Sequence, residues 1–558
     1  MTDRLKIAIA QINPTVGAIS ANAEKIRAFH AHAAEAGADL VVFPELCVLG
    51  YPPEDLVLKP AFQRRALETV GELAQATAGD APAMVVGACR TEDGKLYNAQ
   101  FLLDGGEIAG IRDKHDLPNY GVFDEVRVFD SAPLQSPLDF RGVRLGLMTC
   151  EDMWFPEVPE CLAETGAEIL IAPHGSPFEL GKVDTRLAHG GARVRETGLP
   201  LIMVNQVGGQ DELVFDGTSF ALNADGTLAA RAPAWQESLI VTDWRRGDNG
   251  WSCEKTEIAP ETEGLEAIYQ ALVLGLRDYV GKNRFPGVVF GLSGGVDSAL
   301  TAAIAADALG PDKVWCLMMP SRYTSEESLI DARATAEALG IRLDTISIAP
   351  MVGAFGGALT DTFADRAADA TEENIQSRIR GMLVMALSNK FGHMVVATGN
   401  KSEMSVGYAT LYGDLCGGYA VLKDVYKTTV FGLCNWRNQH HPAGALGPEG
   451  HVIPENVITK PPSAELKADQ RDEDSLPPYE ALDDILECLV EGEMGARDIV
   501  ARGHDEATVA RVENLLYVAE YKRRQAPPGV KITAKNFGRD RRYPITNGFR
   551  DVSLKVWS

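Results

Sequence analysis

The chain has 558 residues, more than one hydrophobic core supports, so its length predicts roughly two to four domains. Hydrophobic residues make up 45% of it and charged residues 23%, a composition typical of globular proteins that excludes a largely disordered chain. The formal net charge of −25 argues against a nucleic-acid partner.

Short aliphatic runs bounded by turn residues predict β-strands in the first part of the chain. They cover residues 7–11, 40–43, 83–88, 145–149, 169–172 and 201–205. Helical periodicity predicts helices over 22–36 and 60–78. Polar residues such as Glu45, Cys150 and His174 stand where strands end. This pattern predicts a layered α/β domain over residues 1–245 with its chemistry at strand ends.

A polar stretch follows, and we expect residues 246–262 to be a linker between this domain and a second one over 263–558. The second domain opens with a predicted helix over 265–280. Strands are then expected at 288–290, 314–319 and 343–348, with helices over 298–309 and 326–339 between them. Such a βαβαβ unit is typical of a doubly wound parallel sheet of the Rossmann type.

Targeting and redox signals favour a cytoplasmic protein. No apolar run reaches the roughly 20 residues of a membrane span, so we expect no membrane partner. The first residues lack the features of a signal peptide. The nine cysteines are dispersed, without a CxxC pair or zinc-type spacing, which fits a reducing compartment.

Three residues of the first domain form a recognisable set. Glu45 follows an apolar strand, Lys114 precedes a Leu-Pro-Asn-Tyr segment, and Cys150 is followed by Glu-Asp. Each signal is weak alone, but together and in this order they resemble the carbon–nitrogen hydrolase (nitrilase) superfamily. The resemblance implies an α-β-β-α sandwich. It also implies that Glu45 is a general base, that Lys114 stabilises an oxyanion, and that Cys150 is the nucleophile that forms a thioester.

Glutaminase members of this superfamily hold glutamine with a Tyr, a Ser and a Lys. The matching positions are Tyr120, Ser176 and Lys182, and Glu125 matches an additional active-site acid. Only 36 positions separate Lys114 from Cys150, which suggests a compact version of the domain.

The second domain carries a glycine-rich turn between a predicted strand and helix. Its residues are Gly291, Leu292, Ser293, Gly294, Gly295, Val296, Asp297 and Ser298. Paired glycines and a helix N-terminus suit an anion, but the turn lacks the lysine of P-loop NTPases. The SGGxDS string resembles the pyrophosphate (PP) loop of ATP-pyrophosphatases, which adenylate a carbonyl or carboxylate.

Later strings are more specific than this loop. They are TEENIQSR at 371–378, ATGNKSE at 397–403, LYGD at 411–414, KPPSAEL at 460–466 and YKR at 521–523. With the first domain, these strings resemble the glutamine-dependent bacterial NAD synthetases over essentially the whole chain.

This resemblance implies further site residues and partners. Thr398 would contact ATP together with the loop, and Asn374, Glu403 and Lys522 would contact deamido-NAD. Asp297 and Glu403 would hold Mg²⁺, which prefers carboxylate oxygens. No tightly bound organic cofactor is implied, and the protein would be a homo-oligomer. A basic stretch over 522–542 is then expected to serve the anionic substrates.

The implied reaction is the final step of NAD biosynthesis. ATP adenylates the nicotinate carboxylate of deamido-NAD, and ammonia released from glutamine at Cys150 displaces AMP. One alternative is a ligase of the same loop family that acts on another carboxylate; the strings NKSE and YGD argue against it. Others are a catalytically silent interaction protein, which the intact motifs disfavour, and a plain amidase with a nucleotide sensor. The amidase would hydrolyse amides other than glutamine without ATP.

Overall fold

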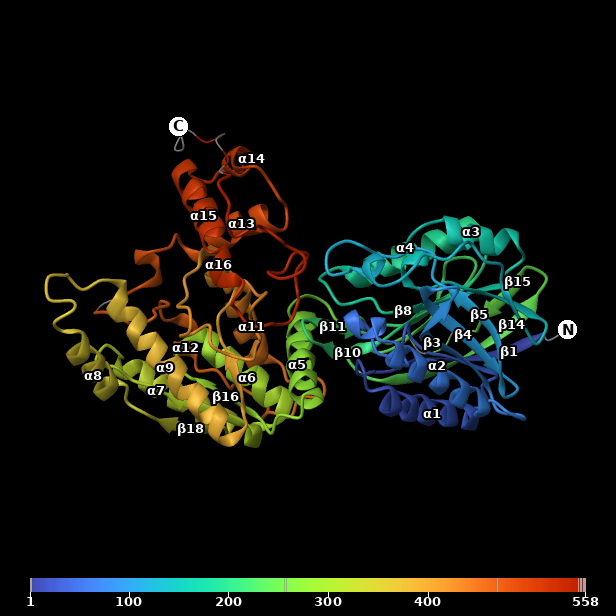
Figure 1. The fold of residues 1–558 in the computed structure, drawn as a ribbon, viewed down its shortest axis with the longest axis horizontal. Helices are drawn as coiled ribbons and strands as arrows, with labels where there is room; N and C mark the ends of the chain where they lie inside the picture. The colour runs from blue at the N-terminus through green and yellow to red at the C-terminus, as the bar shows by residue number, and fades with distance from the viewer. Residues whose placement is uncertain are drawn as a thin grey trace. The chain divides into compact units, whose positions relative to one another are not determined.

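The computed structural model describes residues 3–254, 256, 258–468, 470–549, 551 and 554. The chain divides into two compact units, Met1–Thr262 and Glu263–Ser558, each with its own sheets and core (Figure 1). None of the described helices combines the length and the apolar character that crossing a membrane requires.

The first unit contains two large sheets. The seven-stranded sheet has the order β15 (Gly250–Cys253), β14 (Ser238–Gly247), β1 (Arg4–Gln11), β2 (Leu40–Val42), β3 (Ala83–Glu92), β4 (Lys95–Asp104), β5 (Glu107–Asp113). The six-stranded sheet has the order β13 (Leu228–Arg231), β12 (Phe220–Leu222), β9 (Leu201–Asn205), β8 (Ile169–His174), β7 (Val143–Leu147), β6 (Leu138–Phe140). A separate hairpin joins β10 (Val207–Gln210) to β11 (Leu213–Asp216).

Successive side chains point to opposite faces of each strand, so each sheet can bury one face against the other sheet in a sandwich. Ile7, Ile9 and Val42 point into a core that they share with Ile171 and Val204 of the other sheet. The opposite face of the first sheet packs against α1 (Ile19–Glu35) and α2 (Pro60–Gln75). The outer face of the second packs against α3 (Glu157–Glu164) and α4 (Lys182–Thr197) (Figure 1). The α-β-β-α architecture implied by the resemblance is confirmed.

Residues 246–262, which were expected to form a linker, belong to the first unit. Strand β14 continues to Gly247, and β15 pairs with it at the edge of the first sheet. Trp251 and Cys253 are buried, whereas Gly250 and Ser252 are exposed. A short edge hairpin with one solvated face reads as polar in the sequence, and the chain leaves the first unit only after Thr262.

The second unit is built on a five-stranded parallel sheet, as predicted. Its order is β18 (Arg342–Thr345), β17 (Val314–Met318), β16 (Val288–Gly291), β19 (Met394–Ala397), β20 (Tyr419–Ala420). The chain runs outward from β16 to β18 and then returns to the other side of β16. The carboxyl ends of β16 and β19 therefore flank a topological switch point, where ligands bind in open α/β sheets.

Helices surround this sheet and position the residues beyond it. Helix α6 (Val296–Leu309) follows β16, α7 (Glu326–Leu339) precedes β18, and α9 (Ala370–Phe391) precedes β19. Helix α10 (Lys401–Val406) begins just after β19 and packs on α13 (Tyr479–Val490) and α15 (Glu506–Val518). Helix α11 (Lys427–Gln439) lies against α6 and α5 (Gly264–Lys282).

Candidate active sites

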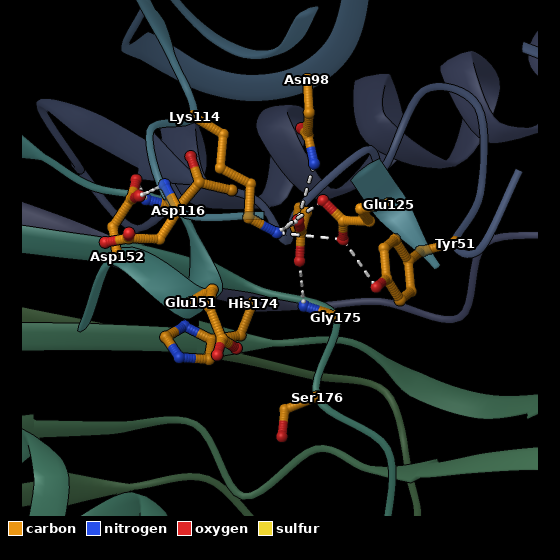
Figure 2. Close-up of polar contacts among 12 residues, drawn as sticks. Tyr51, Asn98, Lys114, Asp116, Glu125, Glu151, Asp152, His174, Gly175 and Ser176 are labelled. Carbon is orange, nitrogen blue, oxygen red and sulfur yellow. Dashed lines mark hydrogen bonds and ion pairs between the residues drawn. The ribbon is translucent and has the colours of Figure 1, made fainter. Parts of the chain in front are cut away.

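Two acids and a lysine meet inside the first unit. Lys114, directly after β5, and Glu45, after β2, are both fully buried. The Lys114 Nζ lies 2.8 Å from Glu45 Oε1, and it also contacts both oxygens of Glu125 at 2.9 and 3.0 Å. Figure 2 shows the Lys114 side chain reaching toward Glu125, with Tyr51 beyond it. The structure thus joins three of the residues that the sequence singled out.

Glu45 is held from several elements at once. Asn98 Nδ2 donates to its Oε1 at 2.7 Å, and the Gly175 N–H donates to its Oε2 at 2.8 Å. Strand β3 approaches closely at Gly87, where an added Cβ would lie 2.2 Å from the Leu46 nitrogen. The carboxylate therefore has a fixed position, which a general base requires.

Two neighbouring carboxylates keep Lys114 protonated. Burial alone would lower the pKa of Lys114, but the carboxylates of Glu125 and Glu45 raise it well above its ordinary value. Burial raises the pKa of Glu125, and Lys114 opposes that effect. Tyr51 OH donates to Glu125 at 2.8 Å and fixes its orientation.

Cys150 opens a short 3₁₀ helix, η3 (Cys150–Met153), and is 3% exposed. Its φ of +46° lies in the left-handed region, a strained conformation for a side chain. Burial, and then the charge of Glu45, raises the pKa of the thiol well above its ordinary value, while Lys114 opposes the shift. The resting side chain is therefore a neutral thiol that needs a base.

Asp152 connects the nucleophile to the lysine. Its Oδ2 accepts the Thr149 N–H at 2.8 Å, and its Oδ1 accepts the N–H groups of Asp116 at 2.8 Å and His115 at 3.1 Å. These bonds tie the turn that carries Cys150 to the segment after Lys114 (Figure 2).

Two of the three residues predicted to hold glutamine, Tyr120 and Lys182, contact side chains in or just after the turn that carries Cys150. Tyr120 OH donates to both carboxylate oxygens of Glu151, the neighbour of Cys150, at 3.0 and 3.1 Å. The Lys182 Nζ lies 4.6 Å from the ring centre of Trp154. Ser176 follows Gly175, and its N–H donates to Asn205 Oδ1 at 2.9 Å.

In the second unit the glycine-rich turn joins β16 to α6. Gly294 has φ +83°, and a Cβ there would lie 2.4 Å from the Ser328 carbonyl oxygen, so only glycine fits. Ser298 Oγ donates to the Gly295 carbonyl at 3.0 Å and accepts the Ser293 N–H at 3.2 Å. The turn is wrapped around the N-terminus of α6, where backbone N–H groups favour an anion.

Asp297 and Glu403, the two residues predicted to hold Mg²⁺, both lie close to the ammonium group of Lys427. Lys427 Nζ pairs with Asp297 Oδ2 and lies 3.4 Å from Glu403 Oε1. Asn400 Nδ2 donates to Asp297 Oδ1 at 2.8 Å. Burial raises the pKa of Glu403 to about 8, and Lys427 opposes this.

This donor set fits Mg²⁺ only in part. Among the described residues, no three or more His, Cys, Asp or Glu side chains form a metal-holding cluster. Two carboxylates nevertheless suit Mg²⁺, because that ion commonly takes its remaining ligands from substrate phosphates and water.

The residues predicted to contact deamido-NAD gather near α10. Glu403 lies in α10 itself, and Thr398, which was predicted to contact ATP, follows β19 directly. Asn374 Oδ1 accepts the Thr410 hydroxyl at 2.8 Å, and Lys522 Nζ donates to the carbonyls of Gly407 at 2.8 Å and Ala409 at 2.7 Å. Asn374 and Lys522 therefore hold the same segment, residues 407–410.

The basic stretch over 522–542 was expected to serve the anionic substrates, but part of it is buried inside the fold. Arg523 and Arg541 are buried and both pair with Glu520, at 2.8 and 2.9 Å. Lys531 is buried and pairs with Asp540 at 3.2 Å. These three cations stabilise the fold and do not form a substrate-binding surface.

Sequence reasoning missed several residues that shape the sites: Tyr51, Asn98, Asp152, Gly175 and Lys427. Gly175 had a weak signal, because it adjoins Ser176. Asn98 lies inside a strand and offered no signal.

Comparisons with known proteins agree with this division. Residues 6–249 match the carbon-nitrogen hydrolase family, and residues 268–526 match the NAD synthase family. The chain is 52% identical over 553 residues to a glutamine-dependent NAD(+) synthetase of Rhodobacter capsulatus, which covers 99% of this chain and 100% of that relative. It is 44% identical over 546 residues to the same-named protein of Acinetobacter baylyi, covering 98% and 99%.

A solved structure gives the same result. The glutamine-dependent NAD+ synthetase of Acinetobacter baumannii in complex with ADP superposes with a TM-score of 0.78 at 43% identity. The superposition covers 98% of this chain and 99% of that one.

Proposed function

The chain belongs to the glutamine-dependent NAD(+) synthetases, and we propose that it amidates deamido-NAD to NAD with ammonia from glutamine and with cleavage of ATP. The buried Glu45–Lys114 pair beside Cys150 carries the glutaminase part of this proposal. The glycine-rich turn at the switch point of the second sheet supports the ATP-dependent part.

The glutaminase half-reaction that we propose uses the residues gathered in the first unit. Glu45 takes the thiol proton as Cys150 attacks the carboxamide carbon of glutamine. The Lys114 ammonium stabilises the oxyanion of the tetrahedral intermediate, which collapses to a thioester as Glu45 returns the proton to the departing ammonia. Glu45 then takes a proton from the water that hydrolyses the thioester, and glutamate and the thiol are released.

Lys114 is well suited to the oxyanion because its charge is permanent. Glu45 and Glu125 raise its pKa, so it stays an ammonium throughout the cycle. A single preorganised donor at such a position is typically worth about 3–4 kcal/mol of transition-state stabilisation.

In the second unit the loop from Gly291 to Ser298 and Thr398 bind ATP, and Asn374, Glu403 and Lys522 bind deamido-NAD. The nicotinate carboxylate attacks the α-phosphate, pyrophosphate leaves against the N-terminus of α6, and ammonia displaces AMP from the acyl-adenylate. Mg²⁺ that enters with ATP would be held by Asp297 and Glu403 and would neutralise charge on the phosphates.

Three further expectations belong to this proposal. The protein works as a homo-oligomer in the cytoplasm, with glutamine, ATP and deamido-NAD as its small-molecule partners. Its glutaminase domain extends to Thr262, beyond the boundary expected near residue 245, and its synthetase domain begins at Glu263. Neither half requires a tightly bound organic cofactor.

The test compares two ammonia donors. NAD formation from deamido-NAD, ATP and Mg²⁺ is measured with glutamine or with ammonium chloride, for wild type and Cys150→Ala. Wild type should use both donors, and the variant only ammonium. Cys161→Ala, a change of the same kind in α3, should behave as wild type. Absence of NAD with either donor would point to another carboxylate substrate.

A further inference from the structure

The base and the nucleophile of the first unit belong to different sheets. Glu45 follows β2 of the seven-stranded sheet, whereas Cys150 follows β7 of the six-stranded sheet. Their alignment therefore depends on how the two sheets are held together at this end of the sandwich. The Gly175 N–H, directly after β8, donates to Glu45 Oε2 at 2.8 Å (Figure 2). Because β8 is the neighbour of β7, this hydrogen bond links the base to the sheet of the nucleophile.

One buried side chain holds the backbone next to that N–H. Asn205 closes β9 and is fully buried. Its Oδ1 accepts the Ser176 N–H at 2.9 Å, and its Nδ2 donates to the Ser176 carbonyl at 3.0 Å and to the Gly217 carbonyl at 3.1 Å. The amide thus uses its oxygen and both of its N–H groups on the backbone. Its orientation is fixed, because a flipped amide would set NH₂ against the Ser176 N–H.

The Asn205 side chain extends the pairing of β8 and β9. The register of these strands ends at His174 and Asn205. Beyond that pair, the Asn205 amide bonds the N–H and the C=O of Ser176, the groups that a further strand residue would bond. Successive residues of an extended chain present their N–H groups to opposite sides. Holding Ser176 toward β9 therefore directs the Gly175 N–H away from β9 and toward Glu45.

Further hydrogen bonds connect Asn205 to the first sheet. The Asn205 N–H donates to Ser219 Oγ at 2.9 Å, and this hydroxyl donates to Gln11 Oε1 at 3.0 Å. Gln11 ends β1, the neighbour of β2, and its Nε2 donates to two backbone carbonyls at 2.8 Å each. All three side chains are fully buried. A chain of buried hydrogen bonds therefore runs from the first sheet through the second and back to Glu45.

We infer that Asn205 is a positioning residue for glutamine hydrolysis, which holds the Gly175–Ser176 backbone so that the Gly175 N–H fixes Glu45 where it takes the Cys150 proton. This inference rests on the proposed glutaminase function and adds to it a residue that acts through the backbone. A misplacement of about 1 Å at a reacting group costs about 100-fold in rate, so the loss should appear in kcat. Since Ser176 is one of the residues predicted to hold glutamine, the test also needs a reaction without glutamine.

The experiment uses the full chain and three variants. Asn205→Ala removes the side chain that holds Ser176, and Glu45→Gln removes the base. Asn223→Ala is the matched control, because Asn223 Oδ1 accepts the Cys253 N–H at 2.7 Å and its Nδ2 donates to the Cys253 carbonyl at 3.2 Å. The same kind of contact is lost there, but Asn223 follows β12 at the end of the sheet opposite to Asn205.

Two rates are measured on each protein. The first is glutamine hydrolysis, resolved into kcat and KM. The second is alkylation of Cys150 by chloroacetamide, followed by mass spectrometry of the Cys150 peptide; the sulfur displaces chloride and the thiol proton passes to Glu45. Asn205→Ala should lower kcat by about 100-fold and slow the alkylation toward the rate of Glu45→Gln. Asn223→Ala should leave both rates unchanged.

A purely structural role for Asn205 would give a different pattern. If Asn205→Ala lowers the urea midpoint of the first unit but keeps the wild-type kcat and alkylation rate, the side chain only stabilises the sheet and the inference is overturned. Equal losses of rate in Asn223→Ala would also overturn it, because the effect would then follow stability.

Two further outcomes are kept apart. If Asn205→Ala does not fold, Ser219→Ala removes only the hydroxyl between Asn205 and Gln11 and should lower kcat in the same direction; an unchanged kcat would overturn the inference. If wild type does not hydrolyse glutamine while the alkylation of Cys150 still depends on Glu45 and Asn205, the proposed glutaminase function fails and the positioning role stands.

Discussion

Replacing Asp152 with asparagine should loosen the hydrogen bonds that hold the turn of Cys150 against the segment after Lys114. The carboxylate of Asp152 is 2% exposed and accepts three backbone N–H groups, one before Cys150 and two after Lys114. Asparagine keeps one acceptor oxygen and replaces the other with a donor. Whichever way the amide turns, its NH₂ group faces a backbone N–H.

The cost follows from counting those groups. At least one backbone N–H and the amide NH₂ lose their partners in a buried place, at about 1–3 kcal/mol each. The first unit should therefore lose about 2–6 kcal/mol of unfolding free energy. A shift of about 1 Å between Cys150 and Lys114 would lower the rate of glutamine hydrolysis by about 100-fold.

Three measurements on the full chain test this reasoning. Glutamine hydrolysis should fall, NAD formation from ammonium chloride should stay within about twofold of wild type, and the unfolding transition of the first unit should move to lower denaturant. Asp116→Asn makes the same chemical change two residues after Lys114, at a side chain that accepts none of these bonds, and should have little effect. Wild-type hydrolysis and stability in Asp152→Asn would refute the argument.

Three other substitutions test separate parts of the molecule. Lys401→Met removes a fully buried ammonium 2.7 Å from Asp424, so the second unit should lose about 3–5 kcal/mol in urea unfolding while glutamine hydrolysis persists; an unchanged midpoint would contradict this. Burial lowers the pKa of His174 to about 4, so its contribution to stability is complete above about pH 6.5 and is lost as pH falls toward 4, by about 1.4 kcal/mol per pH unit. His174→Asn should remove that slope between pH 6.5 and 5 in urea titrations, and an unaltered slope would contradict the assignment. Gly294→Ala places a Cβ 2.4 Å from the Ser328 oxygen and should abolish NAD formation with either donor but leave glutamine hydrolysis intact; retained synthesis would contradict it.

Residues at strand ends were predictable because local sequence defines them. Glu45 and Cys150 each follow a short apolar run, Lys114 precedes a Leu-Pro-Asn-Tyr segment, and the glycine-rich turn lies between a strand and a helix. In each case the relevant signal spans fewer than about ten residues, within the reach of periodicity and turn rules.

The residues that hold these groups in place were not predictable. Asn98 reaches Glu45 across 53 positions, and Asp152 reaches Asp116 across 36. Such contacts depend on the register between strands and on how the two sheets pack, and a local sequence pattern predicts neither. The edge strand β15 escaped detection for a related reason, since four residues with one buried face look like a polar loop.

The two sites share an electrostatic arrangement that serves different chemistry. Lys114 lies between Glu45 and Glu125, and Lys427 lies between Asp297 and Glu403, so each buried ammonium faces two carboxylates. One positive charge cannot balance two negative ones, and the surplus is costly where water is excluded. In the first unit the surplus suits the uptake of one proton from the Cys150 thiol. In the second unit burial raises the pKa of Glu403 to about 8, so a proton offsets the surplus at rest. We expect a divalent cation that arrives with the phosphates of ATP to take the place of this proton, which would let a chain with a net charge of −25 bind anions.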